Sequence, residues 1–292
     1  MTPTIRHRIG QVARIPTKVW QHAWLWSSRR REVANWGELW RLSNPIRLLL
    51  AKRFRSNGSA KDVVVRFRNG LSLAVDSSMR GDLAALVDTY PGYMQNLGLS
   101  LAAGDVVIDV GAHIGAFSVR AAFENPGITV FAFEPDPQNF KRLKENAGRN
   151  GLEEKGLSAF NLAVSSAEEE LMFARGRTST TGSVARTGFF KAPPDAELVV
   201  VSATTVESIF RQHAIGRCRL LKVDCEGSEY DILTQLPDGI VSRIDSMIVE
   251  VHPARAGNPK ELKGVLQSKG FEVIERSHGN GCADLYCRRP LR

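Results

Sequence analysis

Residues 106–117 read Val-Val-Ile-Asp-Val-Gly-Ala-His-Ile-Gly-Ala-Phe, and this run determines which kind of sheet the chain can build. Its first five residues, four apolar and one acidic, end at a glycine, a pattern typical of a fully buried parallel strand. Beyond Gly115 the apolar residues recur with the spacing of a helix that lies on a sheet. A strand, a glycine loop and a helix in this order predict an open α/β sheet that receives a nucleotide-like ligand at the loop.

The composition of this loop indicates which ligand to expect. A dinucleotide site has the pattern G-x-G-x-x-G, whose second glycine lets the backbone approach a pyrophosphate. Here Gly111 and Gly115 are present, but His113 occupies the position of that second glycine. A second apolar strand ends in Glu134, followed by Pro135, and a carboxylate at this place can accept hydrogen bonds from two ribose hydroxyls. Ribose recognition without a pyrophosphate site indicates S-adenosylmethionine.

Three blocks of the sequence, taken together and in order, resemble the signature blocks of FkbM-type methyltransferases. They are residues 109–115 (Asp-Val-Gly-Ala-His-Ile-Gly), 133–137 (Phe-Glu-Pro-Asp-Pro) and 221–229 (Leu-Lys-Val-Asp-Cys-Glu-Gly-Ser-Glu). The resemblance covers roughly residues 80–290. It implies a class I methyltransferase fold, which is Rossmann-like, with a mostly parallel seven-stranded sheet and an antiparallel C-terminal strand. It also implies S-adenosylmethionine as methyl donor and O-methylation of a sugar or glycan, a polyketide or another hydroxylated small molecule.

The first two blocks are expected to hold the methyl donor. The methionine end of the donor is assigned to the glycine loop, and the ribose to the carboxylate after the next strand. The predicted cofactor-binding residues are Asp109, Gly111, Ala112, His113, Gly115, Glu134 and Pro135.

The acceptor proton must be removed by groups at the ends of the next two strands, because an alcohol needs a base before it can be methylated. Asp224 and Glu226 are two residues apart, so they share a face of an extended chain. Clustered carboxylates raise each other's pKa towards neutrality. We therefore predict Asp224, Glu226 and His252 as catalytic residues. The alternative for the acids is that they complement the positive end of the following helix.

Metal dependence is a separate question. Asp224, Glu250 and His252 together are the kind of set that binds a hard divalent cation. A metal-independent role for His252 as general base is the preferred interpretation, so we expect no metal. Other functions that stay open are N- or carboxyl-methylation on the same fold, and a non-catalytic cofactor-binding module at a membrane surface.

The charge of the chain is divided unevenly. The 292 residues carry a net charge of +8, but residues 1–61 hold 13 Lys or Arg against 2 Asp or Glu, and residues 62–292 hold 26 against 29. This contrast predicts a basic N-terminal extension (1–61) and a methyltransferase domain (62–292). A slightly acidic catalytic body argues against a nucleic-acid substrate.

The basic extension also contains all five tryptophans, including the i, i+4 pairs Trp20–Trp24 and Trp36–Trp40, which predict helix. Three interpretations stay open: an arm that packs on the domain or on a second subunit, a peripheral contact with an anionic membrane, and an organelle-targeting segment. No apolar run approaches the roughly 18 residues of a membrane span, and four scattered cysteines suit a reducing compartment. We therefore expect a cytoplasmic protein.

The remaining pattern predicts the order of the elements. Residues 63–75 should form a hairpin around a type I′ Asn69-Gly70 turn, and residues 175–196 a long substrate-recognition loop or lid, or else a solvated insertion. Strands are predicted near 106–110, 128–133, 158–164, 219–224, 245–251, 271–276 and 282–288, and helices near 115–124, 137–149, 205–212, 228–235 and 259–268.

Overall fold

The computed structural model of the chain describes residues 43, 62–76, 90–175, 183–185, 197–225, 227–252, 258–278 and 282–290. The chain divides into two compact units, Met1–Trp40 and Arg41–Arg292, and every described residue belongs to the second. The predicted helical, tryptophan-rich extension lies outside the described residues, as does Glu226. The predicted boundary between residues 61 and 62 stays a prediction.

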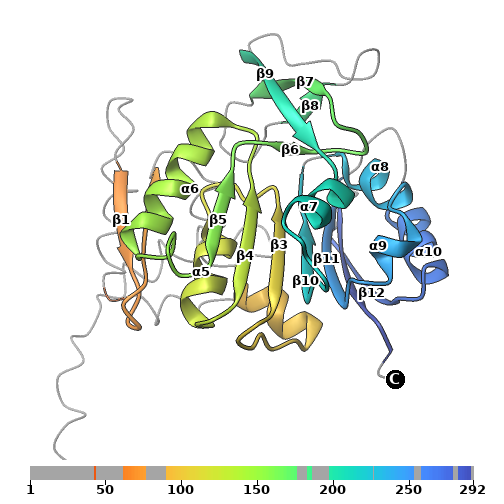
Figure 1. The fold of residues 1–292 in the computed structure, drawn as a ribbon, viewed down its shortest axis with the longest axis horizontal. Coiled ribbons are helices and arrows are strands. Elements are labelled where there is room, and N and C mark those ends of the chain that lie inside the picture. Colours follow the sequence, from red (N-terminus) through yellow and green to blue (C-terminus); the bar gives the residue numbers. More distant parts are fainter. Residues whose placement is uncertain are drawn as a thin grey trace, which may run out of the picture. The chain divides into compact units, whose positions relative to one another are not determined.

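A seven-stranded sheet forms the centre of the second unit (Figure 1). Its strand order is β12-β13-β11-β10-β3-β4-β5, and all neighbours are parallel except β13, which is antiparallel to both β11 and β12. This confirms the mostly parallel sheet with an antiparallel C-terminal strand. The strands are β3 (Val106–Val110), β4 (Thr129–Phe133), β5 (Leu157–Phe160), β10 (Leu220–Val223), β11 (Ser246–Val251), β12 (Glu272–Ser277) and β13 (Ala283–Arg288).

Helices alternate with these strands because apolar positions on each helix pack on the sheet. They are α5 (Ala116–Glu124), α6 (Pro137–Arg149), α7 (Val206–Gln212), α8 (Glu229–Thr234), α9 (Asp238–Val241) and α10 (Pro259–Ser268), and residues 90–97 are also helical. The short α9 was not predicted. The core between the sheet and α7–α10 is apolar and fully buried at positions such as Ile108, Leu221 and Phe210. None of the helices in the described part of the chain is long and apolar enough to cross a membrane.

The predicted strand at 158–164 is wrong as a single element. It ends at β5, and β6 (Ala163–Val164) turns away to join a second sheet of order β6-β9-β7-β8. That sheet contains β7 (Glu170–Arg175), β8 (Ser183–Ala185) and β9 (Glu197–Thr204). Figure 1 shows this second sheet beyond the end of β5, on the side where the carboxyl ends of the main-sheet strands lie.

β7 and β9 were not predicted, and β8 interrupts what was predicted as a continuous loop at 175–196. The sequence pattern did not indicate β7 and β9 because their solvent-facing positions are also apolar. Met172, Leu198 and Val200 on these strands are 39%, 49% and 62% exposed. Alternation of polar and apolar residues, the usual sign of a half-buried strand, is therefore absent from the sequence. The rest of 176–196 lies outside the described residues.

The predicted hairpin is present as β1 (Asp62–Arg66) and β2 (Ser72–Asp76), which pair antiparallel. Its turn differs from the prediction. A type I′ turn requires positive φ at both central residues, but among the described non-glycine residues only His113 and Ala214 have positive φ. Gly70 alone is left-handed at +98°, and its N–H donates to the Phe67 carbonyl at 3.2 Å. The loop therefore has three residues, a form that ends in a left-handed glycine.

Asn146 of α6 and Asn150, the residue that caps the end of this helix, attach the hairpin to the domain. The Asn146 side chain donates to and accepts from the backbone of Ala74, at 3.1 and 2.7 Å, and Asn150 pairs with Ser72 in the same way at 2.7 and 3.0 Å. The two side-chain amides lie one helical turn apart, and they form with β2 the kind of paired hydrogen bonds that a neighbouring strand would form. Buried Asn146 also donates to the Ile114 carbonyl at 2.9 Å, so the hairpin, α6 and the glycine loop are held together.

Candidate active site

The glycine loop after β3 is tightly curled. Gly111, His113 and Gly115 all have positive φ, at +78°, +53° and +84°. A Cβ at Gly111 would lie 1.7 Å from the Asp224 carbonyl oxygen, and one at Gly115 would lie 2.5 Å from a Leu143 methyl group. Both positions therefore need glycine for conformation and for space. The two glycines bring the loop against the end of β10 and against α6.

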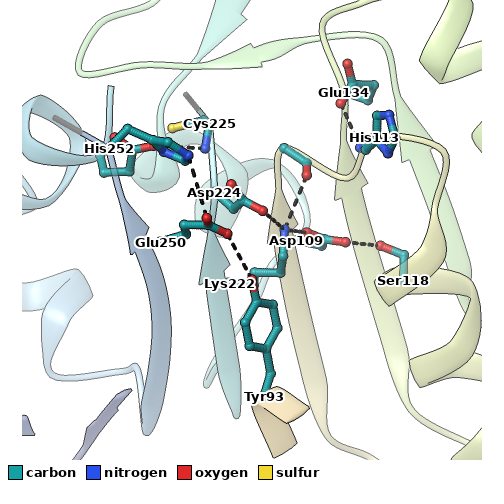
Figure 2. Close-up of polar contacts among 12 residues, drawn as sticks. Tyr93, Asp109, His113, Ser118, Glu134, Lys222, Asp224, Cys225, Glu250 and His252 are labelled. Atoms are coloured by element: carbon teal, nitrogen blue, oxygen red, sulfur yellow. Dashed lines mark hydrogen bonds and ion pairs between the residues drawn. The ribbon is translucent and has the colours of Figure 1, made fainter. Parts of the chain in front are cut away.

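Glu134 lies beside this loop at the end of β4 (Figure 2). Its Oε2 accepts the His113 N–H at 2.7 Å, and its Oε1 accepts the Asp136 N–H at 3.0 Å. The side chain is buried, and burial raises the pKa of this carboxyl from 4.5 to about 7. Oε1 also accepts the Asn139 side-chain amide at 3.4 Å, so the remaining capacity to accept from a ribose hydroxyl lies mainly on Oε2. Pro135, which follows, uses its carbonyl oxygen to accept from the Asn161 amide at 2.9 Å.

A buried cation joins the loop to the end of β10. Lys222 Nζ lies 3.0 Å from Asp109 Oδ1, 3.2 Å from the Gly111 carbonyl oxygen and 3.4 Å from Asp224 Oδ2. Burial by itself would lower the pKa of Lys222. The negative charges of Asp109 and Asp224 have the larger combined effect, so the lysine pKa is raised. The other oxygen of Asp109 accepts the Ser118 hydroxyl.

Asp109 is fully buried, with both oxygens bonded inside the protein. Asp109 therefore holds Lys222, which in turn contacts the glycine loop. The predicted direct contact between Asp109 and the donor stays a prediction. Lys222 was not among the predicted site residues, although a lysine in an otherwise apolar strand indicates an acidic partner or a route to solvent.

His252, at the end of β11, is held by a carboxylate that sequence reasoning did not single out. Its Nδ1 lies 3.0 Å from Oε1 of Glu229, the first residue of α8, which is 1% exposed. Glu229 also accepts the N–H groups of Cys225 and Gly227 at 3.1 and 3.0 Å. The buried acid thus bonds to the loop before its own helix and to a histidine on another strand.

Glu250 lies two residues before His252 and contacts a different group. Its Oε2 accepts the Tyr93 hydroxyl at 3.1 Å, and its Oε1 is 3.8 Å from His252 Nε2. Burial and the nearby charge of Asp224 raise the Glu250 pKa to about 7, although His252 acts in the opposite direction. Burial and the charge of Glu250 raise the pKa of Tyr93 well above its ordinary value. Tyr93 was not among the predicted catalytic or cofactor-binding residues.

Figure 2 shows these groups in one region, at the carboxyl ends of the central strands. The structure brings Asp224, Glu250 and His252 together with the glycine loop, as the sequence predicted for Asp224 and His252. Glu226 stays a prediction because it is not described. Among the described residues, the ligand atoms that converge closely enough for a metal ion belong to Glu250, His278 and Asp284, whereas the set considered from the sequence was Asp224, Glu250 and His252. The expected absence of a metal stays a prediction.

The position of the loop is also informative. The chain moves from β3 to β4 and β5 on one side of the sheet and later to β10 and β11 on the other. Open α/β sheets bind ligands where the strand order reverses in this way. The glycine loop, Lys222 and Asp224 lie at that point, and the sheet order and loop together define a class I methyltransferase.

Comparisons with known proteins agree with this class. The Methyltransferase FkbM domain family matches residues 109–273. The chain is 30% identical over 238 residues to 31-O-demethyl-FK506 methyltransferase FkbM of Streptomyces tacrolimicus, covering 73% of this chain and 91% of that relative. It is 28% identical over 163 residues to hexuronic acid methyltransferase AglP of Haloferax volcanii, covering 56% and 61%. The chain belongs to the FkbM methyltransferase family.

Among solved structures, the chain is similar to Methyltransferase FkbM from Methylobacillus flagellatus KT. That match has 14% identity and a TM-score of 0.43, and covers 65% of this chain and 44% of the other.

Proposed function

We propose that this methyltransferase uses S-adenosylmethionine to methylate a hydroxyl group of a sugar, glycan, polyketide or similar small molecule. One observation carries the proposal: a buried carboxylate, Glu134, lies beside the glycine loop, and a histidine held by a buried acid, His252, lies beside the end of β10. The first suits the ribose of the donor, and the second suits deprotonation of an alcohol.

The fit to the donor rests on the glycine loop. His113 has a side chain where a dinucleotide site needs a bare backbone, so the loop suits a nucleoside better than a pyrophosphate. Glu134 is presented with both oxygens oriented by backbone N–H groups and with acceptor capacity left over. When bound, the donor supplies a methyl group on a sulfonium, which is an excellent leaving group. The protein's own task is to align the acceptor, exclude water and accept a proton.

The charges of the site favour a neutral acceptor over an anionic one. Glu250 lies 3.8 Å from His252 and close enough to Asp224 for that charge to raise the Glu250 pKa, so this acidic cluster would repel a carboxylate substrate. A hydroxyl, by contrast, loses a proton that His252 or Asp224 can accept. The printed name of one relative refers to a 31-O-demethyl compound, which supports a search among hydroxylated acceptors. The name of another refers to a hexuronic acid, which carries hydroxyls and a carboxylate, so carboxyl methylation is the alternative to test.

Calorimetric titration of the full chain tests the donor. We expect S-adenosylmethionine to bind with micromolar affinity, NAD to give no heat, and Glu134→Ala to abolish donor binding. Heat from NAD instead would overturn the assignment of the loop.

Formation of S-adenosylhomocysteine in the presence of matched alcohols, amines and carboxylic acids tests the reaction. Turnover of alcohols alone supports O-methylation, and turnover of amines or acids would replace it with the corresponding alternative. Donor binding without turnover of any acceptor would favour a non-catalytic module.

A further inference from the structure

We propose that Glu229 is a positioning residue that fixes the tautomer and orientation of His252, so that Nε2 accepts the proton of the acceptor hydroxyl. The proposal rests on the O-methyltransferase function above and adds a residue that has no assigned role.

The first step is the direction of the hydrogen bond. Glu229 Oε1 lies 3.0 Å from His252 Nδ1. The same carboxylate accepts two backbone N–H groups, from Cys225 and Gly227. Both oxygens of the acid already accept a backbone N–H, and a proton shared between a carboxylate and an imidazole resides on the imidazole, which is the stronger base, so the arrangement suits the carboxylate. A carboxylate only accepts hydrogen bonds, and Nδ1 therefore carries the hydrogen.

The second step is the state of the other ring nitrogen. A neutral imidazole that carries its hydrogen on Nδ1 has its lone pair on Nε2. Glu250 Oε1 lies 3.8 Å from Nε2, which is beyond hydrogen-bonding distance, so this carboxylate does not hold the hydrogen on Nε2. Glu229 therefore selects the tautomer, and Glu250 is close enough to stabilise the imidazolium once a proton arrives.

The resulting step balances. The acceptor O–H bond breaks and its proton goes to His252 Nε2. The acceptor oxygen bonds to the methyl carbon, while the S–CH₃ bond breaks and its electron pair stays on sulfur. The products are a methyl ether, S-adenosylhomocysteine and an imidazolium paired with Glu229. Buried acids play the same part for histidine in other enzymes that use a histidine base.

A purely structural role for Glu229 is the competing explanation, since it accepts N–H groups next to α8. The chain offers a matched control for it. Glu261 is also an acid in the first turn of a helix, α10, where its side chain accepts the Asn258 N–H in a capping box. Glu229→Gln and Glu261→Gln therefore both remove a charge near a helix N-terminus, and only the first touches a histidine.

The first measurement is the ¹⁵N chemical shifts of the histidine rings in the full-length wild-type protein, with the His252 signal assigned through His252→Gln. We expect the Nδ1–H tautomer at His252. We expect Glu229→Gln to shift the population towards Nε2–H, because a glutamine side chain can donate to Nδ1, and we expect Glu261→Gln to leave it unchanged. An Nε2–H tautomer in the wild type overturns the proposal, even if Glu229→Gln fails to fold. This measurement does not require turnover, so it separates the failure of this inference from the failure of the proposed function.

The second measurement uses kcat once an acceptor is known. Glu229→Gln should lower kcat by roughly 10²–10⁴-fold, the usual contribution of a positioned general base, with little change in KM for the donor. In a His252→Gln background, Glu229→Gln should have almost no further effect, because the two residues act as one unit. An equal fold-loss in both backgrounds would show that Glu229 acts independently of His252 and would overturn the proposal.

Discussion

Lys222 and Asp109 lie opposite each other in register on the parallel strands β10 and β3, with Nζ and Oδ1 3.0 Å apart and both side chains buried. The pair joins the strand that carries the glycine loop to the strand that ends in Asp224. Lys222 also reaches the Gly111 carbonyl oxygen and Asp224, so one cation joins the glycine loop to the end of β10.

Removing this cation should be costly. Lys222→Met leaves Asp109 charged and buried, and breaking a buried pair in this way costs about 3–5 kcal/mol. Urea denaturation measures the loss. Lys263→Met is the control, since Lys263 pairs with Glu275 near the surface at 3.4 Å, and such pairs contribute about 0–1 kcal/mol. Similar losses for the two variants would contradict the structural role of Lys222.

Glycine substitutions should have opposite effects at two positions. Gly111→Ala forces a methyl group into the Asp224 backbone at positive φ, so both stability and donor binding should fall sharply. Gly264→Ala lies within α10 with open space around it and should stabilise the protein by about 0.5–1 kcal/mol. Thermal unfolding with and without S-adenosylmethionine measures both. Normal donor affinity in Gly111→Ala would show that the loop does not hold the donor.

Stability should fall as pH rises from about 4.5 to 7 because of Glu134. The pKa of this carboxyl is about 7 in the folded protein and 4.5 ordinarily, so the folded state binds more protons across that interval. The shift corresponds to about 3 kcal/mol of unfolding free energy, fully present below pH 4.5 and lost by pH 7. Urea denaturation at pH 5 and pH 8 should show a smaller pH difference in Glu134→Gln than in the wild type. An identical difference in the two proteins would refute the assignment.

Alanine variants of Asn146 and Asn150 should have different effects on donor binding, although both weaken the attachment of the hairpin. Asn146→Ala removes the partners of Ala74 and Ile114, and each buried group left unpaired costs about 1–3 kcal/mol. We expect faster amide hydrogen exchange in residues 63–75 and weaker donor binding. Asn150→Ala breaks only the contacts of that side chain with Ser72 and with its own helix, so it should loosen the hairpin and leave donor affinity near normal. Equal donor affinities in the two variants would mean that Asn146 does not support the loop.

Much of the fold was predictable because its signals are local. The strand, glycine loop and helix of residues 106–117 are contiguous, and Asp136 followed by proline marks the start of α6, where the Asp136 side chain accepts the N–H groups of Gln138 and Asn139. Glu134 was also predictable, since a strand of the right kind ends at that residue. The second sheet was missed because its outward side chains are apolar and hide the alternation.

The parallel sheet, the family and the strand-end positions of Glu134, Asp224 and His252 were therefore predictable, because strand periodicity, turn residues and motif spacing are properties of neighbouring residues. Three contacts became known from the folded chain alone: Lys222 with Asp109, 113 positions away, Tyr93 with Glu250, 157 positions away, and Glu229 with His252. These contacts depend on strand order and register, which long-range packing sets and which no local pattern encodes.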